Sequence, residues 1–437
     1  MNSNSKQTGL QKYTLNTLSL FSEHFIRLTV GFLVSLWTIR YLGPDSFGML
    51  SYAQAFAAIL ISFASLGLDA VVVRELLNEK NREGAVLGSV FVLKFGASLI
   101  AFLLIIGSAL TIEGVSQQFY LIVLVGGPVL VSAFSTVEYY FQAKVQSHYI
   151  VQAKTIALIT SSLVRIVLIQ MEASLVAFAY AILFDSFVIA TFLGIFSQRF
   201  GKKFFQWSID LELVKRFFKS ALFLSLNSAM VLIFWNVDKL MLRYLTGDFQ
   251  QVGVYSAAVK LYELWGFIPV VLCASFFPSI LSAKNNATLY KKRLQTLADV
   301  LFLVALGLTI LGVFFSDLII NLALGAEFSS ATGVFSIAML GNVFVFLGVV
   351  GSRYFLAENL EYVLLLRTLI GLICNIIFNY FLIQQYGMIG AAVATVISSF
   401  IVAILADVIF YGQAKTIFHI KLNSVIGLIR WKSWLAA

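Results

Sequence analysis

The chain has 437 residues, of which 60% are hydrophobic and only 12% charged, and its mean hydropathy is +0.93. A soluble domain has about 45 to 50% apolar and about 25% charged residues, so this composition excludes a soluble globular protein. Cys273 and Cys374 are isolated in apolar segments, which indicates neither a disulfide framework nor a zinc site.

Apolar runs of about 20 residues, the length that crosses a bilayer as a helix, recur along the whole chain. The first run contains Glu23 and Arg27 and has no small-residue cleavage site, so we expect a retained helix and not a cleavable signal. The chain is therefore expected to be an all-α integral membrane protein. Its predicted transmembrane helices cover residues 15–41, 47–70, 84–110, 119–143, 150–169, 174–196, 217–242, 253–280, 297–320, 330–352, 362–384 and 388–411.

The basic residues lie almost entirely in every second connecting loop, beginning with the N-terminal segment. Only Arg40 and Arg243 lie in the opposite set of loops. Cytoplasmic loops of membrane proteins carry an excess of Lys and Arg, so both termini are expected in the cytoplasm. This explanation accounts for the net charge of +9 without a nucleic-acid partner.

The segment Arg40–Tyr52 recurs loosely at residues 243–256, and each copy follows the first helix of a six-helix set. Chance similarity between membrane turns is the alternative, because Gly, Pro and Asp are common in turns. Because six is even, both sets begin on the same side of the membrane, so we expect two parallel six-helix lobes with binding between them. The expected divisions are residues 1–196, a cytoplasmic linker at 197–215, residues 216–411, and a basic amphipathic cytoplasmic tail at 412–437.

Four segments, in order along the chain, carry a family resemblance. They are the turn at 40–48, the Leu-Gly-Leu-Asp sequence at 66–69 with Arg74, Asp238-Lys239 followed by residues 252–261, and residues 386–395. Together they resemble the Wzx-type O-antigen and polysaccharide flippases of the multidrug/oligosaccharidyl-lipid/polysaccharide (MOP) exporter superfamily.

This resemblance implies translocation of undecaprenyl-diphosphate-linked oligosaccharide repeat units, used in O-antigen, capsule or exopolysaccharide assembly. Movement would run from the cytoplasmic to the periplasmic face of the bacterial inner membrane, by alternating access of the two lobes. Membrane lipids, a polysaccharide polymerase and a chain-length regulator are the further expected partners. No cofactor, metal or catalytic residue is expected.

Ionisable side chains inside a membrane are costly and persist where they meet water, a partner or a substrate. A diphosphate is an anion that Arg and Lys can bind by charge-assisted hydrogen bonds. Arg27, Arg165, Lys239 and Lys260 are therefore the candidate headgroup-binding cations, and Glu23, Asp238 and Glu263 are the candidate cavity carboxylates for ion coupling.

A structural role is the alternative for each of these residues. Glu23 is one helical turn from Arg27 and can neutralise it. Lys239 can snorkel to the membrane surface, as can Lys94, and Arg165 can lie at the interface. Four further acids can couple ions or simply bridge helices: Glu138, Asp185, Asp299 and Asp407.

The chain contains no nucleotide-binding Gly-x-x-x-x-Gly-Lys-[Ser/Thr] loop, which argues against an ATP-driven pump. An ion-coupled drug antiporter of the same superfamily remains an alternative, although it should prefer acidic binding sites. A membrane-embedded glycan polymerase is a second alternative, but it would need a large outer loop. The outer connections predicted here are about ten residues long or shorter, so they do not supply the large outer loop that a polymerase needs.

Overall fold

The structure is a computed structural model that describes residues 4–425, with side chains described for residues 29–79, 81–221, 225–226 and 228–425. The chain divides into two compact units. The first contains the chain up to Leu42 together with Phe56–Ala229. The second contains Gly43–Ala55 together with the chain from Met230 onward.

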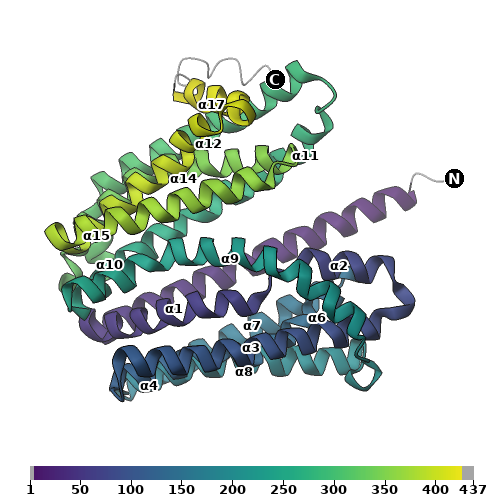
Figure 1. Cartoon of the computed structure of the whole chain (residues 1–437), viewed down its shortest axis with the longest axis horizontal. Coiled ribbons are helices and arrows are strands. Elements are labelled where there is room, and N and C mark those ends of the chain that lie inside the picture. Colours follow the sequence, from purple (N-terminus) through teal and green to yellow (C-terminus); the bar gives the residue numbers. More distant parts are fainter. Residues whose placement is uncertain (1–3, 426–437) are drawn as a thin grey trace. The chain divides into compact units, whose positions relative to one another are not determined.

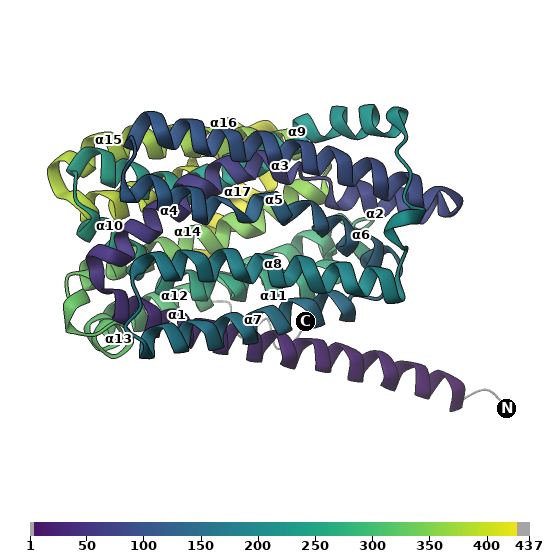
Figure 2. The same cartoon turned by 90° about the horizontal axis from the view of Figure 1, so that it is seen from below.

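The first unit is built of helices joined by short connections, and the pairs α7–α8 and α3–α4 pack side by side (Figure 2). Short 3-10 turns occur at Lys80–Arg82, Ser132–Ser135 and Phe204–Gln206. Its helices are α1 (Asn4–Ser65, shared with the second unit), α2 (Asp69–Asn78), α3 (Glu83–Glu113), α4 (Gln117–Gly126), α5 (Pro128–Val131), α6 (Thr136–Ala143), α7 (His148–Gln170), α8 (Leu175–Phe200) and the first part of α9 (Leu211–Thr246).

In the second unit α14 packs against α12, α15 and α10, and α17 packs against α12 (Figure 1). Leu264–Gly266 and Ala326–Phe328 form 3-10 turns, and Ile401–Leu405 forms a π-helical turn. After α9 the helices are α10 (Phe249–Glu263), α11 (Phe267–Ser282), α12 (Ala287–Phe314), α13 (Ser316–Ala323), α14 (Ala331–Ala357), α15 (Glu361–Phe400), α16 (Ala406–Ile409) and α17 (Tyr411–Val425).

The two long helices α1 and α15 each bend at a glycine residue. Gly43 in α1 has φ 69° and ψ 173°, and Gly387 in α15 has φ 55° and ψ −133°. Both φ values lie in the left-handed region, which glycine adopts without a steric penalty because it has no Cβ. Pro44 follows Gly43 and cannot donate a backbone hydrogen bond, so the chain starts a new helical segment there.

Within the described part of the chain, nine helical stretches are long and apolar enough to cross a membrane. Two of them, Thr29–Asn78 and Glu361–Ile409, contain 50 and 49 residues and include the bends at Gly43 and Gly387. One crossing needs about 20 residues, so each of these stretches is long enough for two. The predicted all-α membrane fold is confirmed; the count of twelve and the cytoplasmic termini stay predictions.

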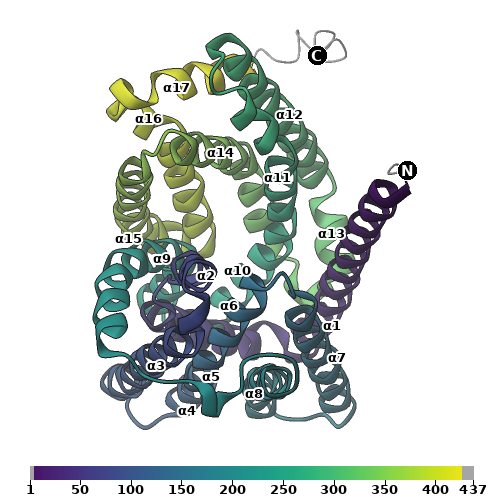
Figure 3. The same cartoon turned by 90° about the vertical axis from the view of Figure 1, so that its right-hand side faces the viewer.

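Many large apolar side chains point outward from these helices, including Ile100 and Leu103 on α3 and Ile310 and Leu311 on α12. Soluble proteins rarely expose large contiguous apolar patches, whereas a lipid-facing helix must. The interior of the second unit contains Leu297, Leu301 and Phe346 from α12 and α14, and Ile417 from α17 packs on the same cluster. Figure 3 shows α17 beside α16, at the same end of the second unit as α12.

Candidate functional site

Four of the seven candidate site residues lie together in the second unit. Lys239 is on α9, and Lys260 and Glu263 are one turn apart on α10. Asp238, Glu263 and Lys260 all act electrostatically on the Lys239 ammonium group, and its Nζ donates to Asn236 Oδ1 at 3.3 Å. Lys260 and Glu263 are exposed and Lys239 is partly exposed. This group, Lys239, Lys260 and Glu263, is called the α9–α10 charge cluster below.

Asp238 points away from that cluster into the packed interior, since consecutive helical residues point about 100° apart. Its carboxylate is buried and accepts three hydrogen bonds of 2.6 Å. The donors are the Tyr255 hydroxyl, the Thr395 hydroxyl and the Asn379 side-chain amide. These residues come from α9, α10 and α15, so the site exists only when the three helices pack.

Around Asp238, not every side-chain oxygen atom takes part in a hydrogen bond among the described residues. Asn379 Nδ2 also donates to Asn375 Oδ1 at 3.0 Å, whereas Asn379 Oδ1 is buried with no hydrogen-bond partner among the described residues. A cavity of about 30 Å³ borders Asp238, Tyr255 and Thr395, enough for one water molecule or small ion. Carboxylate, amide and hydroxyl oxygens are the ligands that hard cations prefer, so this site can hold a monovalent cation or a proton.

Asn375, Asn379 and Thr395 were missed by the sequence analysis. A usable signal was present, because Asn375 and Asn379 are four residues apart in an otherwise apolar stretch and therefore share one helix face. Buried amides in a membrane helix need partners, as buried carboxylates do. Thr395 and Tyr255 lie inside the segments that carry the family resemblance, but nothing in those segments predicts that the two hydroxyls meet Asp238.

Arg165 lies in the first unit, on α7, and is partly exposed. Asp185 on α8 acts electrostatically on its guanidinium group. The buried hydroxyls of Ser161 and Ser162, one turn earlier on α7, have no hydrogen-bond partner among the described residues. No ion pair between Asp185 and Arg165 is seen among the described residues, so both uses of this acid stay open.

Glu23 and Arg27 fall within the helical backbone of α1, but their side chains lie outside the described residues. The roles predicted for Glu23 and Arg27 therefore stay predictions.

Lys94 on α3 does not adopt the snorkelling arrangement that the sequence left open for it. Its side chain is buried, and Nζ donates to Ser135 Oγ at 2.6 Å and to Tyr139 Oη at 2.8 Å. Asp69 and Glu138 act on it electrostatically, and Glu138 accepts a hydrogen bond from Lys154 at 2.7 Å. Lys94 is thus the centre of a second polar network, which joins α2, α3 and α6 inside the first unit.

The positive-inside argument assigned Arg367 and Lys421 to the basic cytoplasmic connections, but Arg367 lies inside α15 and Lys421 inside α17. Both side chains are buried, and both lie against the buried carboxylate of Asp407, at 3.3 Å from Arg367 Nε and 2.6 Å from Lys421 Nζ. The π-helical turn Ile401–Leu405 supplies further acceptors, since Val402 O accepts from Arg367 Nε and Ala403 O from Lys421 Nζ. Burial and the neighbouring Arg367 lower the pKa of Lys421, beyond the last span, to about 7.

The two segments of the sequence repeat also meet in the second unit. A Cβ added to Gly48 would lie 1.9 Å from the Phe249 carbonyl oxygen, and one added to Gly253 would lie 1.8 Å from the Pro44 carbonyl oxygen. Such contacts allow only glycine, because the two backbones touch directly. The repeated glycines thus form the crossing point of α10 and the part of α1 after the Gly43 bend.

Comparison with known proteins agrees with this architecture. A family model described as polysaccharide biosynthesis protein matches residues 14–283. The capsular polysaccharide biosynthesis protein CapF of Staphylococcus aureus is 20% identical, with 90% of this chain and 98% of that protein covered.

Two solved structures have the same fold. The lipid II flippase MurJ in an inward closed conformation matches with a TM-score of 0.74 and 17% identity, covering 95% of this chain and 92% of that chain. An inward-facing multidrug resistance MATE transporter of the MOP superfamily matches with a TM-score of 0.67 and 16% identity, covering 91% and 98%. The MOP-like fold expected from the sequence is therefore confirmed.

Proposed function

Because the chain belongs to the polysaccharide biosynthesis protein family, we propose that it flips undecaprenyl-diphosphate-linked oligosaccharide repeat units across the bacterial inner membrane. The direction is from the cytoplasmic to the periplasmic face, where a polymerase and a chain-length regulator would take up the product. Transport proceeds by exposing the binding residues alternately to the two faces.

The observation that carries this proposal is the α9–α10 charge cluster. Lys260 lies in a helical stretch apolar enough to cross a membrane, and it acts electrostatically on Lys239 of α9, with Glu263 as the partly compensating carboxylate. A diphosphate crossing a low-dielectric layer loses its hydration, and charge-assisted hydrogen bonds to lysine offset part of that cost. Arg165 and Arg27 are the headgroup-binding cations that we propose for the first unit.

Asp238 is the proposed coupling residue. Binding of a cation or proton at its buried carboxylate would change the charge directly behind Lys239, which is the next residue on α9. Occupancy of the Asp238 site can therefore alter how strongly the α9–α10 charge cluster holds an anion, which links an ion gradient to headgroup binding.

A drug antiporter is the second candidate, favoured by the buried carboxylate and by the MATE-like fold. The two functions differ in the charge of their cargo, because an antiporter for cationic drugs would expel carboxylate-bound cations, whereas the flippase holds a diphosphate. Binding of purified protein to the lipid-linked diphosphate glycan, compared with the same glycan without phosphate, separates them.

The test uses a double variant, Lys239→Gln with Lys260→Gln, and measures that binding across a salt series. Each charge-assisted contact contributes about 1.5 to 3 kcal/mol, so we expect more than about tenfold weaker binding of the diphosphate form. Lys219→Gln is the matched control, because it removes an exposed lysine from the same helix α9. Equal binding of both glycans by the unmodified protein would contradict the proposed function.

A further inference from the structure

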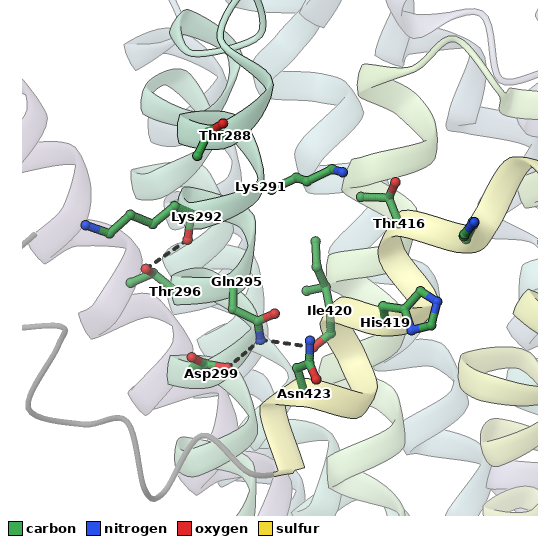
Figure 4. A pocket seen from close by; sticks show the side chains of 11 residues that line it. Thr288, Lys291, Lys292, Gln295, Thr296, Asp299, Thr416, His419, Ile420 and Asn423 are labelled. Atoms are coloured by element: carbon green, nitrogen blue, oxygen red, sulfur yellow. Dashed lines mark hydrogen bonds between the residues drawn. The ribbon is translucent and has the colours of Figure 1, made fainter.

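An open pocket of about 670 Å³ lies between the first turns of α12 and the length of α17, apart from every residue used above for transport (Figure 4). Both walls belong to the second unit. The residues that line the pocket are Thr288, Lys291, Lys292, Gln295, Thr296 and Asp299 on α12, and Lys415, Thr416, His419, Ile420 and Asn423 on α17.

The pocket is positively charged and rich in hydrogen-bonding groups. Three of its lining residues are exposed lysines, and Lys291 extends across the pocket toward Thr416 (Figure 4). Asp299, the one carboxylate among the described lining residues, is almost fully buried, and its Oδ1 accepts a hydrogen bond of 2.7 Å from Gln295 Nε2. Ammonium groups beside threonine hydroxyls, an imidazole and amides suit a phosphate oxygen better than any cationic or apolar ligand.

The two walls of the pocket are held in fixed positions. Gln295 Nε2 donates to the Ile420 carbonyl oxygen at 3.0 Å, which joins α12 directly to α17. On the opposite side of α17, Lys421 is bound by Asp407 and Ala403 O at 2.6 and 2.7 Å. Gly351 on α14 makes room for that ammonium group, because a Cβ there would lie 2.7 Å from Lys421 Nζ. The buried ion cluster therefore positions α17 as a rigid wall.

Exposed apolar side chains lie close in sequence to the lining residues of both helices, and they favour a membrane lipid over a soluble anion as the occupant. Leu289 is 37% exposed beside Thr288, and Leu422 and Val425 are 45% and 54% exposed near Asn423. α12 then continues as one of the helices apolar enough to cross a membrane. A cationic pocket with exposed apolar side chains nearby suits the boundary between lipid headgroups and acyl chains. A soluble phosphate would make no contact with the apolar side chains.

We propose that the pocket between α12 and α17 binds the phosphate headgroup of an anionic membrane phospholipid. The predicted cytoplasmic location of both elements places this site at the inner leaflet. Lys291 and Lys415 contact the phosphate from opposite walls, and Leu289 and Leu422 contact the acyl chains. Lipid bound there would tie α17 to the start of α12, independently of the transport substrate.

The experiment reconstitutes the full chain in nanodiscs and measures lipid retention by native mass spectrometry after mild detergent exchange. The comparison is between phosphatidylglycerol and phosphatidylcholine, for the unmodified protein and for the double variant Lys291→Gln with Lys415→Gln. We expect retention of phosphatidylglycerol by the unmodified protein and at least about tenfold weaker retention by the variant.

The matched control is Lys215→Gln with Lys219→Gln, which removes two exposed lysines from the start of α9 and should leave lipid retention unchanged. Equal retention of the two lipids, or equal retention by the Lys291/Lys415 variant, overturns the proposal. If millimolar inorganic phosphate displaced the lipid and bound with the same affinity as the lipid, the site would belong to a soluble anion. That result would also overturn the proposal. Glycan binding is not measured, so this result is independent of the proposed flippase activity.

Discussion

At the residue scale, Asp238 combines complete burial with a shell of neutral donors. Tyr255, Thr395 and Asn379 each donate to its carboxylate, whereas the cation nearest in sequence, Lys239, belongs to the partly exposed side of α9. A buried carboxylate without a buried ion pair costs several kcal/mol unless a proton or metal ion neutralises it. The Asn379 oxygen, which has no partner in the described part of the chain, and a small cavity beside Asp238 indicate where that ion would lie.

We therefore predict that Asp238→Asn removes cation binding while preserving the fold, because asparagine has the same shape and no charge. Thermal unfolding in detergent, with sodium chloride compared with choline chloride and at several pH values, measures this directly. A ligand at ten times its Kd stabilises the folded state by about 1.4 kcal/mol, and the variant should lose that increment. Asp317→Asn on α13, an exposed carboxylate, is the control. A cation response that survives in Asp238→Asn would contradict the coupling site.

At the scale of elements, two kinds of contact join helices of the second unit. α10 and the part of α1 after Gly43 cross at Gly48 and Gly253, where the backbones touch. α15, α16 and α17 are joined instead by Asp407, which lies between the buried cations Arg367 and Lys421. The first contact depends on the absence of side chains, and the second depends on charges that each need the others.

Gly48→Ala should destabilise the protein by about 1 to 3 kcal/mol, the usual cost of an added methyl group in a tightly packed contact. The added Cβ would overlap the Phe249 carbonyl oxygen, so α10 has to move. Gly307→Ala on α12 is the control, since nothing lies within 4 Å of its added Cβ and alanine favours helix. Thermal unfolding midpoints of the two variants test this, and equal midpoints would show that the crossing tolerates separation.

At the scale of the whole molecule, the distribution of basic loops predicts the orientation in the membrane. The connection that contains Ser208 is held on the first unit, where the backbone N–H of Ser208 donates to the Gly84 carbonyl oxygen at 3.1 Å and Arg82 pairs with Asp210. Two backbone amides and the Arg82 charge lower the pKa of the Asp210 carboxyl, because they stabilise its charged form. The orientation itself follows from the positive-inside rule.

Single cysteines in a background without Cys273 and Cys374 test the orientation. Ser208→Cys should react with a membrane-impermeant maleimide only after the cells are permeabilised, because the linker is predicted to be cytoplasmic. Val115→Cys, in the exposed connection between α3 and α4, should react in intact cells. The opposite labelling pattern would invert the predicted topology.

The sequence alone determined the membrane class, the helical fold class and the family resemblance of this protein. Membrane insertion depends on the summed hydropathy of about 20 consecutive residues, and both the helical class and the family segments are local in the chain. The intramembrane positions proposed for Lys239 and Lys260 rest on the same local property. Their proximity to Glu263 also followed in part, because Lys260 and Glu263 are three residues apart on one helix.

Only the tertiary structure decided which charges are partnered. Asp238 meets Asn379 and Thr395, which are 141 and 157 residues away, and the Arg367–Asp407 contact joins the first turns of α15 to α16, beyond the bend at Gly387. Lys421 lies in a C-terminal segment whose composition is typical of a surface tail, but its side chain is fully buried. The sequence shows which side chains are charged, but the free energy of a buried charge depends on the partners and the water that lie around it after folding. Those surroundings are set by the packing of the whole fold, so the sequence alone does not give them.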